Sequence, residues 1–446
     1  MIRRLRCLTA AAAMLIAAAV TTPPADATTI QKVVSPGGIE AWLVYEPSLP
    51  LVALNFAFVG GAGNDPADKP GVGYMVSSTL DDGAGDLDAK AFQQQVENNA
   101  VELRFSVTHD YFYGSIRLLR DRMEPSFDLL RLALTQPRFD ADAIGRTREQ
   151  IMAGLRRETT DPGSIANKEW WRTAFPGHPY GRPTGGTLTS IPTITADDLR
   201  TYARQMLTRD TLKVAAVGDI DAATLGKTLD RVFGALPATG TRVAVPNAPM
   251  RDGGRRIVTQ LNVPQAVVRL GGAGIMRKDP DFIPAYVVNH ILGGGSFTSR
   301  LYDEVREKRG LAYGVSSYLL SMRHAAMFMA NTQTQADSTR EALGLIEAQI
   351  QRMVKDGPTE DELTKAKAYL KGSYALNFDT STKIAGVLLQ NQLDDLGIDY
   401  IEKRNGLMDA VTIEDARRAA KRLGPGGLLV TVVGAPKDLT SKEPGG

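Results

Sequence analysis

Two stretches of the sequence resemble one another: I-T-A-D-D-L at residues 194–199 and V-T-I-E-D-A at residues 411–416. Each is followed by an apolar run that ends in glycine, V-A-A-V-G at 214–218 and V-T-V-V-G at 430–434. In both copies the distance between the two stretches is nearly the same. An order of motifs that recurs in this way predicts that the chain is an internal duplication.

Looser matches extend the repeat toward the N-terminus. They pair residues 49–58 with 263–271 and residues 139–144 with 358–363. The second pair predicts two helix starts, because acidic residues are favoured in the first turn of a helix. Two tandem copies of roughly 210 residues would each have the size of an ordinary domain. The join at 236–256 is rich in Pro, Gly and Ala, so we expect domains at 28–240 and 257–446.

The pattern of apolar residues in each copy predicts an α+β fold. The first copy has strand-like runs at 41–45, 52–58, 103–107, 111–116 and 212–217, and helix-like runs at 89–98, 122–135, 141–157 and 197–207. Neighbouring strands with helices grouped between them predict a mixed or largely antiparallel sheet with helices packed on one face. Two such halves facing one another would form one half of a clamshell.

The N-terminus is typical of a secretory signal peptide. A cluster of arginines precedes an apolar run at 7–20, and A-D-A at 25–27 offers small residues for cleavage. The apolar run is too short for a membrane span, so we expect residues 1–27 to be removed and the protein to be periplasmic. Removal would take away Cys7, which is the only cysteine. A chain without cysteine suits an oxidising compartment.

Composition excludes several classes of protein. The chain has 446 residues with 52 Lys+Arg and 50 Asp+Glu, a formal charge of +2 that comes from the predicted signal peptide. This balance excludes a strongly basic nucleic-acid binder, and the 43% hydrophobic content excludes a disordered chain. A single cysteine excludes an internal disulfide framework or a Cys-rich zinc module.

Motif searches within the chain give no catalytic site. G-G-A-G at 60–63 continues into N-D-P, which predicts a turn and not a dinucleotide site. The sequence has neither a P-loop nor a G-x-S-x-G elbow, and H-E-x-x-H and H-x-x-E-H are also absent. The four histidines are His109, His178, His290 and His324. They are scattered, so structural or surface roles are expected for them, because a zinc hydrolase usually needs three protein ligands and a bound water.

The most informative segment is 291–320. It predicts a glycine-rich loop at 293–297, a helix at 298–308 and a strand at 311–320. Arg306 and Tyr313 would flank the junction between this helix and strand and could be neighbours. An arginine and a phenol facing a cleft can donate hydrogen bonds to a peptide carbonyl or to an oxyanion. The alternative is that Arg306 serves only the helix end and that Tyr313 belongs to the core.

The same segment carries a resemblance to a known family. L-G-G-G at 292–295, continuing to S-R-L-Y-D-E-V-R-E-K-R-G-L-A-Y at 299–313, resembles the second-domain signature of the pitrilysin/insulinase family of zinc metallopeptidases. Residues 47–80 are similar to the start of the family's first domain, and H-P-Y-G at 178–181 is a further family-like run. The resemblance covers nearly the whole chain beyond residue 27.

The resemblance implies a metal site that this chain lacks. In active members the helix after Gly71 carries H-x-x-E-H, and these positions are Tyr74, Ser77 and Ser78 here. The third ligand, a glutamate, aligns with Gly154, or with Ala153 if the register slips by one residue. None of these residues can bind the metal, so no zinc-bound hydroxide can form. The resemblance therefore implies a member with no catalytic residue or metal of its own, inactive when alone.

The residues that match the substrate-binding arginine and tyrosine of the family's second domain are present in this chain. In the family, an arginine and a tyrosine spaced like Arg306 and Tyr313 reach the substrate across the cleft, and split members pair a zinc subunit with one that carries this pair. This chain resembles that second subunit, as does the alpha subunit of mitochondrial processing peptidase. The resemblance implies a partner with H-x-x-E-H that holds zinc, and a peptide substrate. The implied substrate-binding residues are Arg306, Tyr313, Gly293, Gly294, Gly295, Ser296 and Phe297.

Two other interpretations stay open. The chain could be a peptide-binding or envelope assembly module that takes no part in hydrolysis. It could also be a lone zinc peptidase, which would require zinc in the isolated chain.

Overall fold

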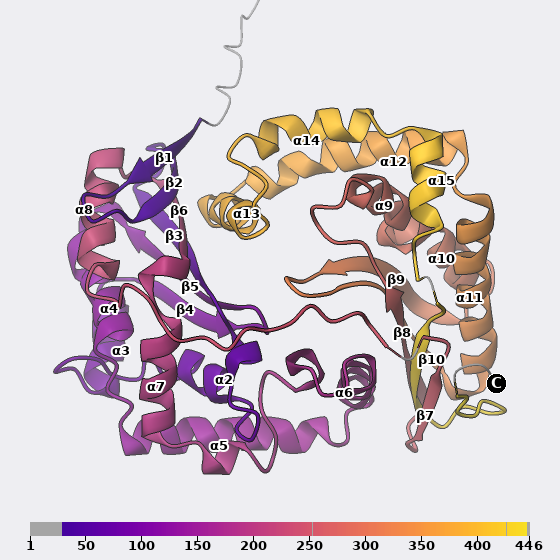
Figure 1. Ribbon diagram of the computed structural model, residues 1–446, viewed down its shortest axis with the longest axis horizontal. Coiled ribbons are helices and arrows are strands. Elements are labelled where there is room, and N and C mark those ends of the chain that lie inside the picture. Colours follow the sequence, from indigo (N-terminus) through magenta and orange to yellow (C-terminus); the bar gives the residue numbers. More distant parts are fainter. Residues whose placement is uncertain (1–28, 252, 425, 444–446) are drawn as a thin grey trace, which may run out of the picture.

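The computed structural model describes residues 29–251, 253–424 and 426–443 (Figure 1). The predicted signal peptide lies outside these residues. Within the described ranges, no helix is long and apolar enough to cross a membrane. The chain forms two halves, each built on one sheet (Figure 1). Between the halves, residues 234–251 and 253–255 contain no helix or strand.

The first half contains a six-stranded mixed sheet. Its strands are β1 (Ile30–Val34), β2 (Glu40–Tyr45), β3 (Leu51–Val59), β4 (Glu102–Val107), β5 (Tyr111–Leu119) and β6 (Leu212–Gly218). Their order is β1-β2-β6-β3-β5-β4. Strands β2 and β6 are parallel, and every other pair of neighbours is antiparallel. The predicted mixed sheet is confirmed.

The second half repeats this topology. Its strands are β7 (Arg256–Gln260), β8 (Gln265–Ala273), β9 (Ala312–Ser321), β10 (Ala326–Gln335) and β11 (Leu429–Gly434), in the order β7-β11-β8-β10-β9. Strands β7 and β11 are parallel and the other neighbours are antiparallel. This order matches β2-β6-β3-β5-β4 strand for strand, as a duplication would produce.

Helices cover the outer face of each sheet (Figure 1). In the first half they are α2 (Val72–Ser77), α3 (Ala89–Asn98), α4 (Met123–Thr135), α5 (Ala141–Glu158), α7 (Ala196–Met206) and α8 (Ala222–Phe233). Leu54, Phe56 and Phe58 of β3 point into the core beneath these helices, and the intervening Ala57 points to the inner face. This alternation follows from the two-residue period of a strand.

The second half has an equivalent outer layer. Its helices are α9 (Phe282–Asn289), α10 (Arg300–Tyr302), α11 (Thr339–Asp356), α12 (Glu360–Gly372), α14 (Tyr400–Asp409) and α15 (Ile413–Ala420). Ala266, Val268 and Leu270 of β8 are buried in the core of this half.

The two halves exchange one helix each. Helix α6 (Pro162–Ala174) from the first half packs on β8 and β11, and α13 (Ser381–Leu393) from the second half packs on β3 and β6. The Trp170 indole N–H donates to the Leu429 carbonyl at 3.2 Å. In the other direction, the Gln392 side-chain amide donates to the Val214 carbonyl at 2.9 Å. Each inner face is therefore covered by a helix of the opposite half.

The segment around the glycine run differs from the prediction. Gly293 and Gly294 belong to a π turn, His290–Gly294, and not to a loop. The predicted helix at 298–308 consists of one α turn, α10, and a second π turn, Asp303–Glu307. Close packing explains why residue 293 is a glycine. A Cβ at this position would lie 2.5 Å from Ser317 Oγ and 2.7 Å from the Ser317 backbone nitrogen. The backbone thus lies directly against β9.

Candidate functional site

The helix at the position of the zinc motif is α2, which is short and has serine side chains that bond to its own backbone. Tyr74 is 39% exposed. The hydroxyls of Ser77 and Ser78 both donate to the Tyr74 carbonyl at 2.9 Å. The residues at the three motif positions therefore satisfy the backbone of α2 or face solvent, and none of them is a zinc ligand of the usual kind.

The fourth position of the degenerate site is equally unsuited to a metal. Gly154 lies in α5, which packs against α2. The Arg157 guanidinium is the one group within 4 Å of where a side chain on Gly154 would begin, at 3.9 Å. Within residues 29–443 as the structure describes them, no group of three or more His, Cys, Asp and Glu side chains could hold a metal ion. The donor set thus does not fit zinc.

The four histidines have structural surroundings. His109 Nε2 lies 3.0 Å from the Arg182 carbonyl, and burial lowers the pKa of His109. His178 accepts a hydrogen bond from the Tyr180 N–H at 3.1 Å. The ring of His290 stacks on Tyr369, and His324 lies 3.3 Å from Asn247.

The start of α2 is held by a buried carboxylate. Asp65 accepts hydrogen bonds from the N–H groups of Gly71 at 2.7 Å and Gly73 at 2.9 Å. Burial raises the pKa of Asp65 to about 7, and the two N–H groups oppose this rise. Because Gly71 has a φ of +103°, a backbone region that favours glycine, this turn is tightly specified.

We expect the buried Asp65 to make stability depend on pH. An aspartate in an unfolded chain has a pKa of about 3.9, so the folded chain binds this proton more tightly. The resulting stabilisation is fully present below pH ~4 and is lost as pH rises through about 7. Relative to Asp65→Asn, the parent should lose up to about 4 kcal/mol of unfolding free energy between these limits. Urea unfolding at several pH values measures this difference. Asp68→Asn, which changes a nearby exposed aspartate, should show no such change.

The structure brings Arg306 and Tyr313 together. The Arg306 guanidinium carbon lies 4.7 Å from the centroid of the Tyr313 ring and 4.8 Å from that of the Tyr302 ring. Arg306 also donates a hydrogen bond to the Tyr302 hydroxyl. Tyr313 is 87% exposed, which is incompatible with a core role. The guanidinium is thus in contact with two tyrosine rings, and these contacts limit its motion.

This cluster forms one wall of a groove. The groove has a volume of about 1190 Å³ and lies on the inner face of the second sheet, beside the start of α6. Ser296 and Phe297 line it together with Tyr302, Arg306 and Tyr313. Its other lining residues are Gly163, Gln265, Val267, Arg269, Gly314, Val315, Ser316, Asn331, Thr332 and Gln333. The groove therefore combines polar strand residues with aromatic and apolar side chains, and an extended peptide could contact both.

The five residues of the predicted glycine-rich loop, 293–297, do not share one environment. Gly293 is buried against β9, whereas Ser296 and Phe297 line the groove. Ser296 has a φ of +47°, and the exposed ring of Phe297 packs edge-on against Tyr302 at 5.1 Å. Tyr302 was not anticipated as a site residue. Its spacing of four residues from Arg306 is the signal that places both side chains on one side of the helical segment.

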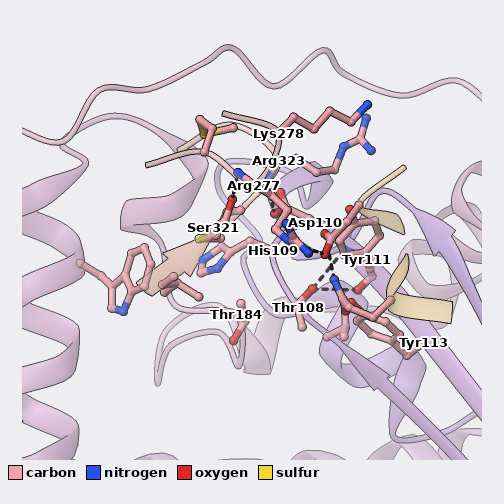
Figure 2. A pocket seen from close by; sticks show the side chains of 17 residues that line it. Thr108, His109, Asp110, Tyr111, Tyr113, Thr184, Arg277, Lys278, Ser321 and Arg323 are labelled. Atoms are coloured by element: carbon pink, nitrogen blue, oxygen red, sulfur yellow. Dashed lines mark hydrogen bonds and ion pairs between the residues drawn. The ribbon is translucent and has the colours of Figure 1, made fainter. Parts of the chain in front are cut away.

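A second cavity, of about 670 Å³, lies between the two halves. Figure 2 shows His109, Asp110 and Tyr111 of the first half near Arg277 and Arg323 of the second. This cavity could not be expected from the sequence, because its walls come from several separate segments of both halves.

Asp110 ties the two halves together beside this cavity. Its carboxylate accepts a hydrogen bond from the Tyr180 hydroxyl at 2.5 Å and one from the Arg323 N–H at 3.0 Å. The Tyr180 hydroxyl in turn accepts from the His324 N–H at 3.1 Å. Burial raises the pKa of Tyr180. A buried network with all its members bonded makes the arrangement of the halves rigid.

Comparison with known proteins shows similarity to peptidase M16 proteins. Residues 193–370 match the family described as "Peptidase M16 inactive domain". An uncharacterized zinc protease of Streptomyces coelicolor is 26% identical over 92% of this chain and 90% of its own. The non-peptidase homolog YmxG of Helicobacter pylori is also 26% identical, over 76% of this chain and 78% of its own.

Solved structures agree. A crystal structure of a peptidase M16 inactive domain from Pseudomonas fluorescens has a TM-score of 0.86 and 28% identity, covering 93% of this chain and 99% of that one. Similarity therefore extends through both halves and both exchanged helices. The chain is therefore similar, in both halves, to proteins described as a peptidase M16 inactive domain or as a non-peptidase homolog.

Proposed function

We propose that this chain is the metal-free, substrate-binding subunit of a periplasmic heterodimeric zinc endopeptidase that acts on peptides or unfolded segments. The observation that carries the proposal is the pair of Arg306 and Tyr313 on the wall of a groove, in a chain whose own metal positions hold no ligand. The partner would be a subunit of the same family with H-x-x-E-H, and zinc would lie in that subunit.

The chemical contribution of this chain would be positioning and charge stabilisation. The Arg306 guanidinium can donate charge-assisted hydrogen bonds to the oxygen of a peptide carbonyl or of a developing oxyanion. The flanking Tyr302 and Tyr313 rings limit its motion before substrate arrives, so less freedom is lost on binding. Strand β9 is the outermost strand of its sheet and lies beside the groove. An extended peptide bound there would make sequence-tolerant backbone contacts.

A second candidate function uses the same groove without hydrolysis. The chain would then bind a peptide or an envelope protein during assembly. The relative from Helicobacter pylori, which is named as a non-peptidase homolog, favours this alternative. The two functions differ in one property, which is whether a bound peptide is cut when a zinc-bearing subunit is present.

Co-purification with a zinc-bearing family member tests both candidate functions. We expect the isolated chain to contain no stoichiometric zinc and to cut no peptide, and the mixed complex to hydrolyse an unstructured peptide. Peptide binding without a partner or hydrolysis would support the assembly module instead. Stoichiometric zinc and hydrolysis by the isolated chain would contradict both functions.

Tyr313→Phe is expected to lower kcat/KM of the mixed complex by about two- to tenfold, the effect of one lost neutral hydrogen bond. The ring that stacks on Arg306 remains, so the complex should still form. Peptide hydrolysis by the reconstituted complex measures the change. Tyr45→Phe, at an exposed tyrosine in the first half, is the matched control, and equal activity of both variants would exclude a role for the Tyr313 hydroxyl.

A further inference from the structure

A third cavity, separate from the groove, lies within the second half. It has a volume of about 340 Å³ and is bordered by α9, α12, α13, α14 and the 3₁₀ segment Ser373–Phe378. Its apolar and aromatic lining consists of Phe282, Ile283, Tyr286, Leu370, Tyr374, Val387, Tyr400 and Met408. An apolar cavity of this size with a few polar groups is the usual form of a small-molecule site.

The first unusual group in this cavity is Arg404. It is 6% exposed, and its guanidinium lies 3.9 Å from the centroid of the Tyr374 ring. It donates to the Leu370 carbonyl at 3.2 Å and to Asn405 Oδ1 at 3.3 Å. In the part of the chain that the structure describes, no carboxylate pairs with it. A buried cation without an anionic partner is costly, so an anion entering the cavity would be strongly attracted.

The second unusual group is Asn391. It is also 6% exposed, and its side-chain nitrogen is buried with no hydrogen-bond partner among the described residues. Asn391 lies in α13 and lines the same cavity as Arg404. Buried polar groups in proteins are almost always bonded. An unpartnered donor here points to an acceptor atom on a ligand.

The remaining charges in the cavity leave an excess of positive charge. Arg277 lies 4.4 Å from the Phe282 ring centroid and donates to the Tyr400 hydroxyl at 2.8 Å. Its partner is Asp394, at 3.6 Å. Asp394 therefore offsets Arg277, and Arg404 is left without a counter-charge.

We propose that this cavity binds a monoanionic carboxylate attached to an apolar or aromatic group. The carboxylate would accept hydrogen bonds from Arg404 and Asn391, and the apolar part would pack on Tyr286, Tyr374 and Met408. Such a group occurs in a free aromatic acid and at the C-terminus of a peptide with an apolar last residue. The proposal does not depend on the partner subunit or on the groove at Arg306.

Calorimetric titration of the chain with matched acids and amides tests the proposal. The probes are N-acetyl-phenylalanine and the peptide Ala-Ala-Phe, each as the free acid and as the amide. We expect an acid to bind at least about tenfold more tightly than its amide, the effect of a charge-assisted hydrogen bond. Binding of the peptide acid identifies a peptide C-terminus as the ligand, and binding of the small acid alone identifies a free acid. Equal affinities for acids and amides, or no binding of any probe, would overturn the proposal.

Two variants locate the site. Asn391→Asp is nearly isosteric and places a negative charge in the cavity that Arg404 lines, so it should abolish binding of the acid while the melting temperature is kept or raised. Asn391→Leu removes the donor without adding charge and should weaken binding less. Asn98→Asp, at an exposed position in the first half, is the control. If both Asn391 variants bind the acid as tightly as the parent, the site is not this cavity.

Discussion

Arg306→Ala is expected to lower kcat/KM of the mixed complex by about 10- to 100-fold, because a hydrogen bond from a charged group is worth about 1.5–3 kcal/mol. The loss should be greater than for Tyr313→Phe, since the guanidinium supplies both the charge and the paired donors. Two rings hold it on the groove wall, at 4.7 Å and 4.8 Å. Steady-state hydrolysis of an unstructured peptide measures the change, and size-exclusion chromatography verifies that the subunits still associate.

Two further variants separate the role of Arg306 from a general effect of charge. Arg309→Ala removes a neighbouring arginine that is ion-paired with Glu304, and it should leave kcat/KM nearly unchanged. Arg306→Lys keeps the charge but loses the planar donors and the stacking, so it should recover little activity. If Arg306→Ala and Arg309→Ala have the same activity as the parent, Arg306 has no part in substrate binding.

Trp170→Ala is expected to lower the free energy of unfolding by about 3–5 kcal/mol, as for other buried aromatic residues. Trp170 is fully buried on the inner face of the opposite sheet, among Met327, Met329 and Leu429. A Cβ on Gly271 would lie 2.6 Å from the Trp170 ring, so the indole fits directly against the strand backbone. Its removal would leave a cavity and take one hydrogen bond from the Leu429 carbonyl. Denaturant unfolding measures the loss.

The adjacent Trp171 provides a matched control. It is half-buried and lines the cavity between the halves, so Trp171→Ala should cost less than Trp170→Ala. Leu388→Ala, on the other exchanged helix, tests the reciprocal contact at a buried position. Similar losses for Trp170→Ala and Trp171→Ala would contradict the view that the inward-facing indole holds α6 on the opposite sheet.

Five strands and four helices of the first half could be predicted from the sequence because they depend on local patterns. The expected strand at 103–107 is β4, at 102–107, and the expected helix at 89–98 is α3 with the same bounds. The exchange of α6 and α13 could not be predicted in this way. An apolar helix face indicates that a helix packs on a sheet, but it does not indicate which of two similar sheets is covered.

Local patterns are also insufficient to predict every candidate binding site. Arg306 and Tyr313 could be expected to meet because they flank one helix–strand junction. The cavity around Arg404 and Asn391 could not, because its walls come from four helices and a 3₁₀ segment that are brought together only by tertiary packing. Neither residue lies in a recognisable motif, and their significance comes from burial without a partner.

The helix exchange has a consequence for how the protein is made. The inner face of the first sheet, which includes Trp42, Ala57 and Val217, is covered by α13. Because α13 is translated long after β6, this apolar surface must stay open until most of the chain has left the ribosome. A nascent first half therefore exposes an apolar sheet face, and such a surface favours association until α13 covers it. A gene split at the join would yield two fragments, each with an uncovered apolar sheet.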